Sequence, residues 1–149
     1  MDDQPIEVRH GAFTVSTNRT RLGVDAALSL LRTTSWGQTT ERETLARAMA
    51  NSLCFGLYDG GRLIGFGRVV TDRATYAYWT DVVTAPEYRR RGLGQWLRQC
   101  MLDHPELQGL RRVGLLTSDA VSLYRRLGFT TELGELTYMD RRPPTAAPK

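Results

Sequence analysis

The chain has 149 residues, a hydrophobic fraction of 41%, a charged fraction of 24% and a formal net charge of +4. This length is typical of one domain, which buries about two thirds of its unfolded surface in a single core. No apolar run approaches the ~20 residues of a membrane-spanning helix, and the N-terminus lacks the basic start and apolar stretch of a secretory signal. We therefore expect a soluble, cytoplasmic protein without a membrane partner.

The first part of the chain predicts one strand and two helices. Residues 13–16 alternate weakly between apolar and polar side chains, which favours a strand. Thr40 and Glu43 have the spacing of a capping box and predict the start of a second helix. The loop between the helices carries Trp36. The residues at helical spacing that predict the first helix are Val24, Ala27, Leu28 and Leu31.

The middle of the chain predicts two hairpins. Strand-like runs over 53–58 and 63–71 flank the turn sequence Asp59-Gly60-Gly61. A second turn at Asp72-Arg73 leads into a run over 75–84 that is rich in aromatic and β-branched residues. These segments predict a largely antiparallel sheet.

Beyond Pro86, which ends that strand, the pattern alternates between helix and strand. A helix is predicted from Gly92 onward because apolar residues recur at helical spacing, and 113–117 reads as a buried strand. Asp119 stands where an N-cap belongs, before a helix over 120–127 that ends at Gly128. We expect a final hairpin over 129–131 and 136–140 and a disordered, proline-rich tail over 141–149.

The two cysteines, Cys54 and Cys100, have no partner at metal-ligand or redox spacing, and the two histidines are in the N-terminal tail (His10) and at a predicted helix end (His104). We interpret both thiols as small core residues and expect no metal site.

The segment over 81–95 indicates an anion-binding site. A strand is followed by a short loop with three arginines and two glycines, and then by an amphipathic helix. The first amides of a helix have no intrahelical partner, and the helix dipole adds about half a positive charge there. Glycines at this position let a phosphate approach the backbone, and guanidinium groups bind it by charge-assisted hydrogen bonds.

Two common nucleotide-binding motifs do not fit this segment. The dinucleotide pattern G-x-G-x-x-G would need a glycine where Leu97 stands, and no G-K-[ST] of a P-loop occurs. What remains is R-x-x-G-x-G, present over 89–94, which resembles the pyrophosphate-binding motif of the GNAT acetyltransferases. A second segment, over 120–129, is similar to the A-x-x-L-Y-x-x-x-G-F segment of that family. The resemblance extends from the first strand to about Asp140.

The resemblance implies an α/β (α+β) fold, with a mixed, mostly antiparallel sheet of six to seven strands, about four helices and a single domain over 1–140. It implies that the strand ending near Thr84 and the strand over 113–117 are neighbours that splay apart, and that acetyl-CoA lies in the cleft between them. Backbone groups of the strand would pair with the pantetheine arm, and the helix start would hold the pyrophosphate. The residues implied in cofactor binding are Val82, Val83, Thr84, Arg89, Arg90, Arg91, Gly92, Leu93, Gly94, Gln95, Asp119 and Tyr124.

Two residues are candidates for the chemistry. Family members with a tyrosine at the place of Tyr124 use it to protonate the departing thiolate, a role that suits a phenol. The alternative to this catalytic role is that Tyr124 only packs in the core, because it also completes the apolar stripe of its helix. Asp81 is the candidate base, since the acceptor ammonium must lose a proton before it attacks. Asp81 is equally consistent with a structural carboxylate or with orientation of the amine.

The acceptor is expected to be a primary amine, with a small molecule favoured. Aromatic faces and carboxylates together suit a cation, and the substrate-binding candidates are Trp36, Trp79 and Asp81. Core packing is the alternative for each aromatic residue. Strand alternation predicts that Trp79 and Asp81 share one face of their strand. The sequence leaves open which amine is the acceptor and how long the acyl group is. It also leaves open the oligomeric state, including whether the protein forms a homodimer.

Two other functions compete with catalysis. A domain of this fold that binds acyl-CoA without turnover would act as a sensor or interaction module, although Tyr124 argues against that. The arginine clusters also suit nucleic acid, but they are dispersed along the chain and one lies inside the cofactor signature. We therefore expect no nucleic-acid partner.

Overall fold

The computed structural model describes residues 4–144, which form two compact units that divide after Leu116. The first unit holds a six-stranded sheet whose strands lie side by side in sequence order, each antiparallel to the next until the parallel pair β5 and β6. The mixed, mostly antiparallel open sheet predicted from the sequence is confirmed. The strands are β1 (Glu7–His10), β2 (Phe13–Ser16), β3 (Leu53–Asp59), β4 (Arg62–Thr71), β5 (Tyr76–Thr84) and β6 (Arg112–Leu115).

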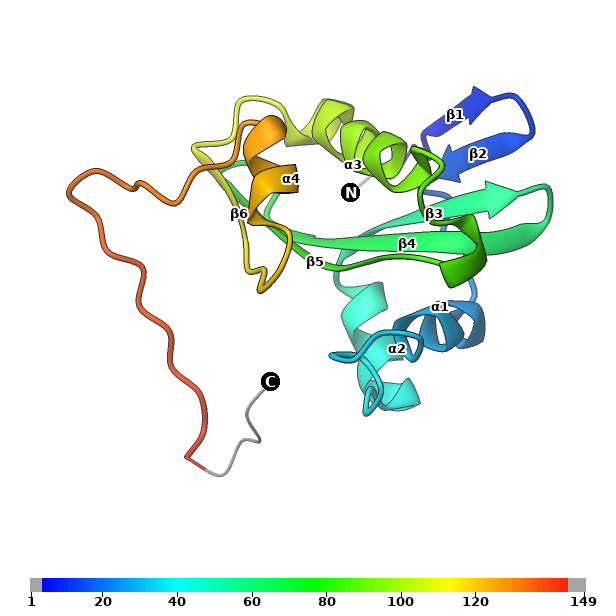
Figure 1. The fold of residues 1–149 in the computed structure, drawn as a ribbon, viewed down its shortest axis with the longest axis horizontal. Helices are drawn as coiled ribbons and strands as arrows, with labels where there is room; N and C mark the ends of the chain where they lie inside the picture. The colour runs from blue at the N-terminus through cyan, green and yellow to red at the C-terminus, as the bar shows by residue number, and fades with distance from the viewer. Residues whose placement is uncertain (1–3, 145–149) are drawn as a thin grey trace. The chain divides into compact units, whose positions relative to one another are not determined.

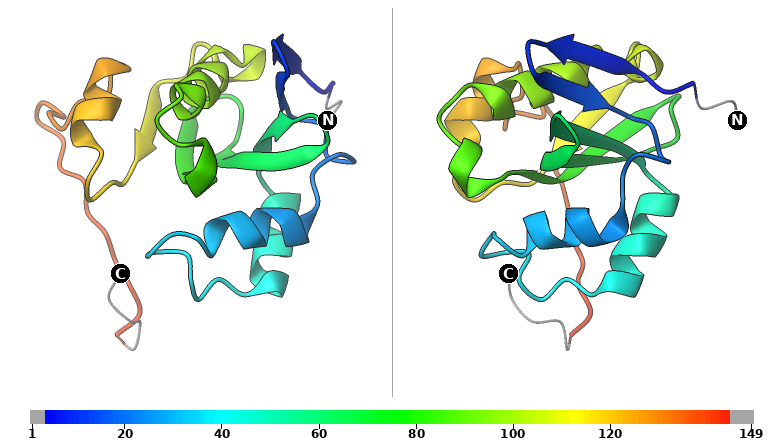
Figure 2. Two further views of the ribbon diagram at one scale, coloured as in Figure 1. Left: turned by 45° about the vertical axis from the view of Figure 1, so that its right-hand side comes forward. Right: turned by 90° about the vertical axis from the view of Figure 1, so that its right-hand side faces the viewer.

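Helices cover both faces of this sheet. Helices α1 (Val24–Leu31) and α2 (Arg42–Ala50) lie on one face, and α3 (Leu93–Asp103) lies on the other (Figures 1 and 2). Short 3₁₀ turns, η1 (Pro86–Tyr88) and η2 (Pro105–Leu107), flank α3. Helix α3 packs so closely on β4 that a Cβ on Gly67 would lie 2.8 Å from the sulfur of Met101. No helix in residues 4–144 is long and apolar enough to cross a bilayer.

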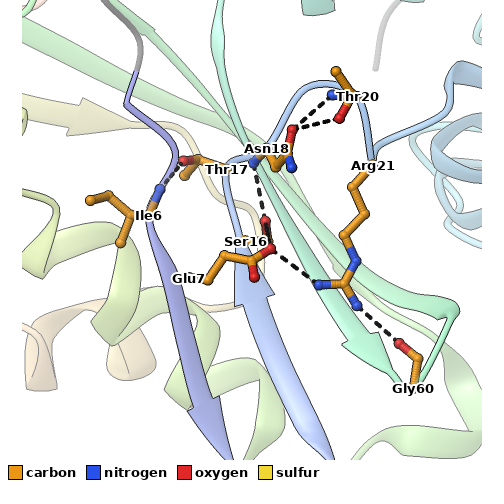
Figure 3. Close-up of polar contacts among 8 residues, drawn as sticks. All are labelled: Ile6, Glu7, Ser16, Thr17, Asn18, Thr20, Arg21 and Gly60. Carbon is orange, nitrogen blue, oxygen red and sulfur yellow. Dashed lines mark hydrogen bonds and ion pairs between the residues drawn. The ribbon is translucent and has the colours of Figure 1, made fainter.

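Of the hairpin formed by β1 and β2, only β2 was predicted from the sequence. All four residues of β1 are exposed, so it has no apolar alternation to reveal it. Polar contacts tie it to the loop before α1 (Figure 3). Glu7 accepts a hydrogen bond from Ser16 Oγ at 2.7 Å and from Arg21 Nη1 at 3.2 Å, and Arg21 Nη2 donates to the carbonyl of Gly60 at 3.0 Å.

Strand β5 contains a β-bulge, which matters for the site. Val83 pairs with Phe66 and Thr80 pairs with Arg68, so β5 has one residue more than β4 between these pairs. Asp81 lies in this stretch with φ 56°, a left-handed conformation that is unusual for a residue other than glycine. The extra residue interrupts the alternation of side chains between the two faces of the strand.

Helix α2 begins without the predicted capping box. Its N-cap is Glu41, which makes no side-chain capping bond, so Thr40 and Glu43 do not cap each other. The helix is stabilised at its other end, where Arg19 donates to the carbonyls of Met49 at 2.9 Å and Ser52 at 2.6 Å.

The second unit, described up to residue 144, contains one α-helix, α4 (Val121–Arg126), followed by Gly128 at φ 98°. The predicted final hairpin is wrong: residues 127–144 contain no strand, although their apolar side chains suggested two. Leu136, Tyr138 and Met139 are exposed. A two-stranded ribbon without further packing is marginal in stability, and no strand of the described chain pairs with this segment. Residues 141–144 form no helix or strand, and the rest of the predicted tail lies outside the described residues.

Candidate active site

The site begins where β5 loses one of its two neighbours. Parallel pairing with β6 runs from Tyr76 opposite Arg112 to Trp79 opposite Leu115, where β6 ends. Strand β5 continues to Thr84, and over 80–84 it pairs with β4 alone among the strands of residues 4–144. The predicted neighbouring strands are therefore neighbours, and the backbone groups on one side of 80–84 are released from sheet pairing.

Helix α3 starts close to the end of β5. Its N-cap is Gly92, at φ 78° and ψ 0°, and no side chain caps the helix. Trp96 makes the first intrahelical bond, to the carbonyl of Gly92 at 3.1 Å. The amides of the first turn are therefore left without intrahelical acceptors, at the positive end of the helix dipole. This arrangement suits an anion.

The two glycines of this junction are needed for different reasons. Gly92 has a positive φ, which strains any residue with a side chain, and open space surrounds the position of its absent Cβ. At Gly94 a Cβ would lie 3.1 Å from the hydroxyl of Thr84 and 3.0 Å from a guanidinium nitrogen of Arg98. Gly94 therefore allows the helix start to approach the end of β5.

Three exposed arginines surround the helix start. Arg89 Nε donates to the carbonyl of Thr84 at 3.1 Å. The guanidinium of Arg91 lies over the rings of Phe13, at 5.5 Å, and Tyr88, at 5.2 Å. Within residues 4–144 none of Arg89, Arg90 and Arg91 forms an ion pair with a carboxylate. Their charge is available to an external anion.

Tyr88 packs against this arginine cluster and was not predicted from the sequence as a site residue. Its hydroxyl donates to Asp59 Oδ2 at 2.6 Å, and this hydrogen bond raises the pKa of Tyr88. Arg62, which pairs with Glu87, lies over the same ring. The ring under Arg91 is therefore held by β3 and β4.

The bulge directs Asp81 away from the face that strand alternation predicted. Asp81 accepts a hydrogen bond from Arg68 Nε at 2.8 Å, and Arg68 pairs with Thr80 across the strands, so this carboxylate lies on the α1/α2 face. Trp79 pairs with Val69, the next residue of β4, and therefore lies on the other face. The expectation that Trp79 and Asp81 share a face is wrong, because Asp81 lies within the bulge in a left-handed conformation, where side chains no longer alternate between the faces.

Arg68 joins Asp81 to helix α2. Its Nη1 donates to Ser52 Oγ at 3.0 Å, and Ser52 in turn donates to the carbonyl of Ala48 at 2.7 Å. Neither Arg68 nor Ser52 was predicted from the sequence as a site residue. A signal was present, since Arg68 is the one charged residue in the otherwise apolar run over 63–71.

The aromatic candidates for substrate binding differ in exposure. Trp79 retains 2% of its accessible surface and belongs to the core, whereas Trp36 retains 45%. Trp36 lies in the turn after α1, where Thr34 accepts a hydrogen bond from the amide of Gly37 at 2.8 Å. Of these two candidates, Trp36 is the one whose side chain is exposed enough to contact a ligand.

The remaining site candidates belong to the second unit. Tyr124 is buried, and its ring meets that of Phe129 edge to face at 5.6 Å. Asp119 is not the predicted N-cap: α4 begins after Ala120, whose amide donates to Thr117 Oγ1 at 3.0 Å. The N-cap is Ala120, and no side chain caps α4.

Of the two cysteines predicted as core residues, Cys54 is buried, whereas Cys100 is only half-buried. Desolvation raises the pKa of each thiol to about 11. Both therefore remain protonated near neutral pH, which disfavours a thiolate nucleophile.

Comparison with known proteins identifies the family. Residues 24–129 match the Acetyltransferase (GNAT) family. The chain belongs to the GNAT acetyltransferases. A curated protein of Gibberella zeae that carries an acetyltransferase name is 32% identical over 144 residues, covering 81% of this chain and 80% of that protein. The chain is thus an acyltransferase of a family that generally uses acetyl-CoA.

Solved structures agree with this assignment. The crystal structure of a GNAT-family protein from Xanthomonas campestris pv. campestris is 41% identical, with a TM-score of 0.81, covering 89% of this chain and 94% of that one. A Staphylococcus aureus protein, 22% identical, has a TM-score of 0.71 with 88% and 99% covered. Glucosamine-6-phosphate N-acetyltransferase from Arabidopsis thaliana, 17% identical, has a TM-score of 0.61 with 86% and 99% covered. The last two relatives share the fold.

Proposed function

We propose that this GNAT acetyltransferase transfers the acetyl group of acetyl-CoA to a primary amine, with a small-molecule amine favoured, by direct attack in a ternary complex. The observation that carries the proposal is the start of α3. Uncapped first-turn amides and arginines without carboxylate partners lie together there, beside the strand segment that has lost its pairing partner. The proposal extends the 24–129 family match, which spans both compact units, to a single catalytic domain over 1–140.

Coenzyme A fits the groups of the first unit. Its pyrophosphate would accept hydrogen bonds from the amides over 91–95 and from the side chains of Arg89, Arg90 and Arg91. Its pantetheine amides would pair with backbone groups of Val82, Val83 and Thr84 on the side of β5 that β6 does not reach. The thioester supplies an activated acetyl group and a thiol leaving group. In the second unit, Asp119 and Tyr124 are assigned to the cofactor from the family resemblance.

The proposed reaction balances in one transfer. The amine nitrogen attacks the thioester carbonyl, a C–N bond forms, and the C–S bond breaks. Tyr124 donates its phenolic proton to the departing sulfur. The proton that the acceptor nitrogen loses goes to Asp81 or to water. Trp36 would contribute a ring face to the cationic acceptor.

A sensor that binds acyl-CoA without turnover is the alternative function, and the test distinguishes the two. Acetyl-CoA at a hundredfold excess over its dissociation constant should add about 2.7 kcal/mol to the free energy of unfolding. Both functions require this increase, which thermal unfolding measures. Release of free thiol with a panel of polyamines, amino acids, aminoglycosides and lysine peptides is required by the enzyme alone. A protein whose melting temperature is indifferent to every acyl-CoA would contradict both.

A further inference from the structure

We propose that Arg68 is a positioning residue, which fixes the carboxylate of Asp81 so that its second oxygen receives the acceptor amine during attack. The inference rests on the proposed function, because it assigns a residue to the acceptor side of the same site. Arg68 would act through Asp81 and would not touch the cofactor.

The geometry forms a continuous chain of hydrogen bonds from helix α2 to Asp81. The carbonyl of Ala48 accepts from Ser52 at 2.7 Å, Ser52 accepts from Arg68 Nη1 at 3.0 Å, and Arg68 Nε donates to Asp81 Oδ2 at 2.8 Å. Two nitrogens of one planar guanidinium are thus held at fixed angles. Because both partners are fixed by the fold, the orientation of the carboxylate is fixed as well.

The carboxylate keeps one oxygen for a ligand. Within residues 4–144, Asp81 has no hydrogen-bond donor besides Arg68, which uses Oδ2 alone. The side chain of Asp81 retains 19% of its accessible surface and that of Arg68 retains 16%. The pair is therefore largely removed from solvent screening, yet Asp81 is not closed off.

The backbone supports a functional reason for this arrangement. The φ of 56° at Asp81 lies in the left-handed region that favours glycine, and such strain persists where surrounding structure maintains it. Here the strain directs Asp81 to the face of Arg68. It does so in the strand segment that has already separated from β6.

This placement suits the chemistry of an attacking amine. Positive charge develops on the nitrogen as the C–N bond forms, before the nitrogen loses its proton. A preorganised carboxylate oxygen that accepts an N–H bond stabilises that charge. Misplacement of such a group by about 1 Å costs up to a hundredfold in rate, so a residue that only orients Asp81 has a measurable effect.

The test is a double-mutant cycle on turnover. With the panel amine that the wild type uses fastest, Arg68→Gln should lower kcat/KM at least tenfold and leave the dissociation constant of acetyl-CoA within twofold. In an Asp81→Asn background, Arg68→Gln should have no further effect on kcat/KM, because Arg68 acts only through the carboxylate. Arg68→Lys should recover part of the loss, since an ammonium can pair with Asp81 but cannot reproduce both guanidinium bonds.

Two further variants keep the result interpretable if Arg68→Gln folds poorly. Ser52→Ala removes the other partner of Arg68 and should lower kcat/KM severalfold. Arg73→Gln is the matched control, because Arg73 is also little exposed, has φ 61° and pairs with Glu106 at the turn between β4 and β5. It should keep wild-type kcat/KM.

The outcomes separate this inference from the proposed function. Equal losses in the wild-type and Asp81→Asn backgrounds would give Arg68 a purely structural role, and unchanged kcat/KM in Arg68→Gln would also overturn the inference. Neither result would contradict the proposed function, the transfer of an acetyl group to an amine. A wild type that acetylates no panel amine overturns the proposed function, and with it the role of Arg68.

Discussion

The two halves of β5 differ in how many partners they have. From Ala77 to Trp79 the strand pairs with β4 on one side and β6 on the other, and its buried residues join the core. From Thr80 to Thr84 it pairs with β4 alone, carries a bulge and leads into the uncapped start of α3. One strand thus combines a half that stabilises the sheet with a half whose backbone is available to a ligand.

This contrast separates stability from binding along a single strand. Changes in the paired half should lower the free energy of unfolding and spare the cofactor. Changes at the unpaired half should affect ligand binding or turnover and have smaller effects on stability.

Trp79→Ala tests the paired half and should have the largest effect. The side chain is 2% exposed, so its removal should cost about 3–5 kcal/mol of unfolding free energy. Denaturant unfolding with and without acetyl-CoA measures both quantities, and the stabilisation by acetyl-CoA should persist. Trp36→Ala, which truncates an exposed tryptophan, is the comparison for stability. A Trp79→Ala variant that keeps wild-type stability but has a raised KM for the amine would contradict this expectation and indicate that Trp79 binds the substrate.

Gly92→Val tests the unpaired end. A side chain at φ 78° distorts the helix start and occupies the open space where an anion would approach. We expect the gain of about 2.7 kcal/mol from a hundredfold excess of acetyl-CoA to disappear. Gly109→Val is the matched control, because Gly109 has φ 72°, has open space around it and lies after α3. If both variants retain the gain, the pyrophosphate is bound elsewhere.

Tyr124→Phe tests whether the second unit supplies the general acid. Loss of the phenol should reduce kcat about hundredfold and leave acetyl-CoA binding unchanged. The edge-to-face contact with Phe129 needs only the ring, so the variant should fold. Tyr138→Phe, in an exposed tyrosine of the same unit, should keep full turnover. Normal turnover in Tyr124→Phe would assign the ring to packing alone.

The sequence predicted the elements that carry a clear period. Helix α3 and the two central hairpins were found because their apolar residues recur regularly between turn residues. β1 escaped because it is exposed throughout, and the C-terminal hairpin was wrong because β-like composition does not ensure a pairing partner. Strand formation depends on neighbours that a local pattern does not contain.

The site was less predictable than the fold. The loop and helix start at 89–95 were visible as a motif, since both glycines and arginines are local signals. The connection of Asp81 to Arg68 was not, because it depends on a bulge that forms between two strands. Likewise, Phe13 lies under Arg91 although 78 positions separate them in the chain, a pairing that only the folded sheet creates.

The bulge in β5 also makes this strand sensitive to its length. Two residues, Asp81 and Val82, lie between Thr80 and Val83, opposite the single residue Gly67 of β4. Deleting one of them would remove the bulge and restore regular pairing, so the left-handed conformation that places Asp81 beside Arg68 would be lost. Strand β5 should therefore tolerate substitutions between Thr80 and Val83 far better than deletions or insertions.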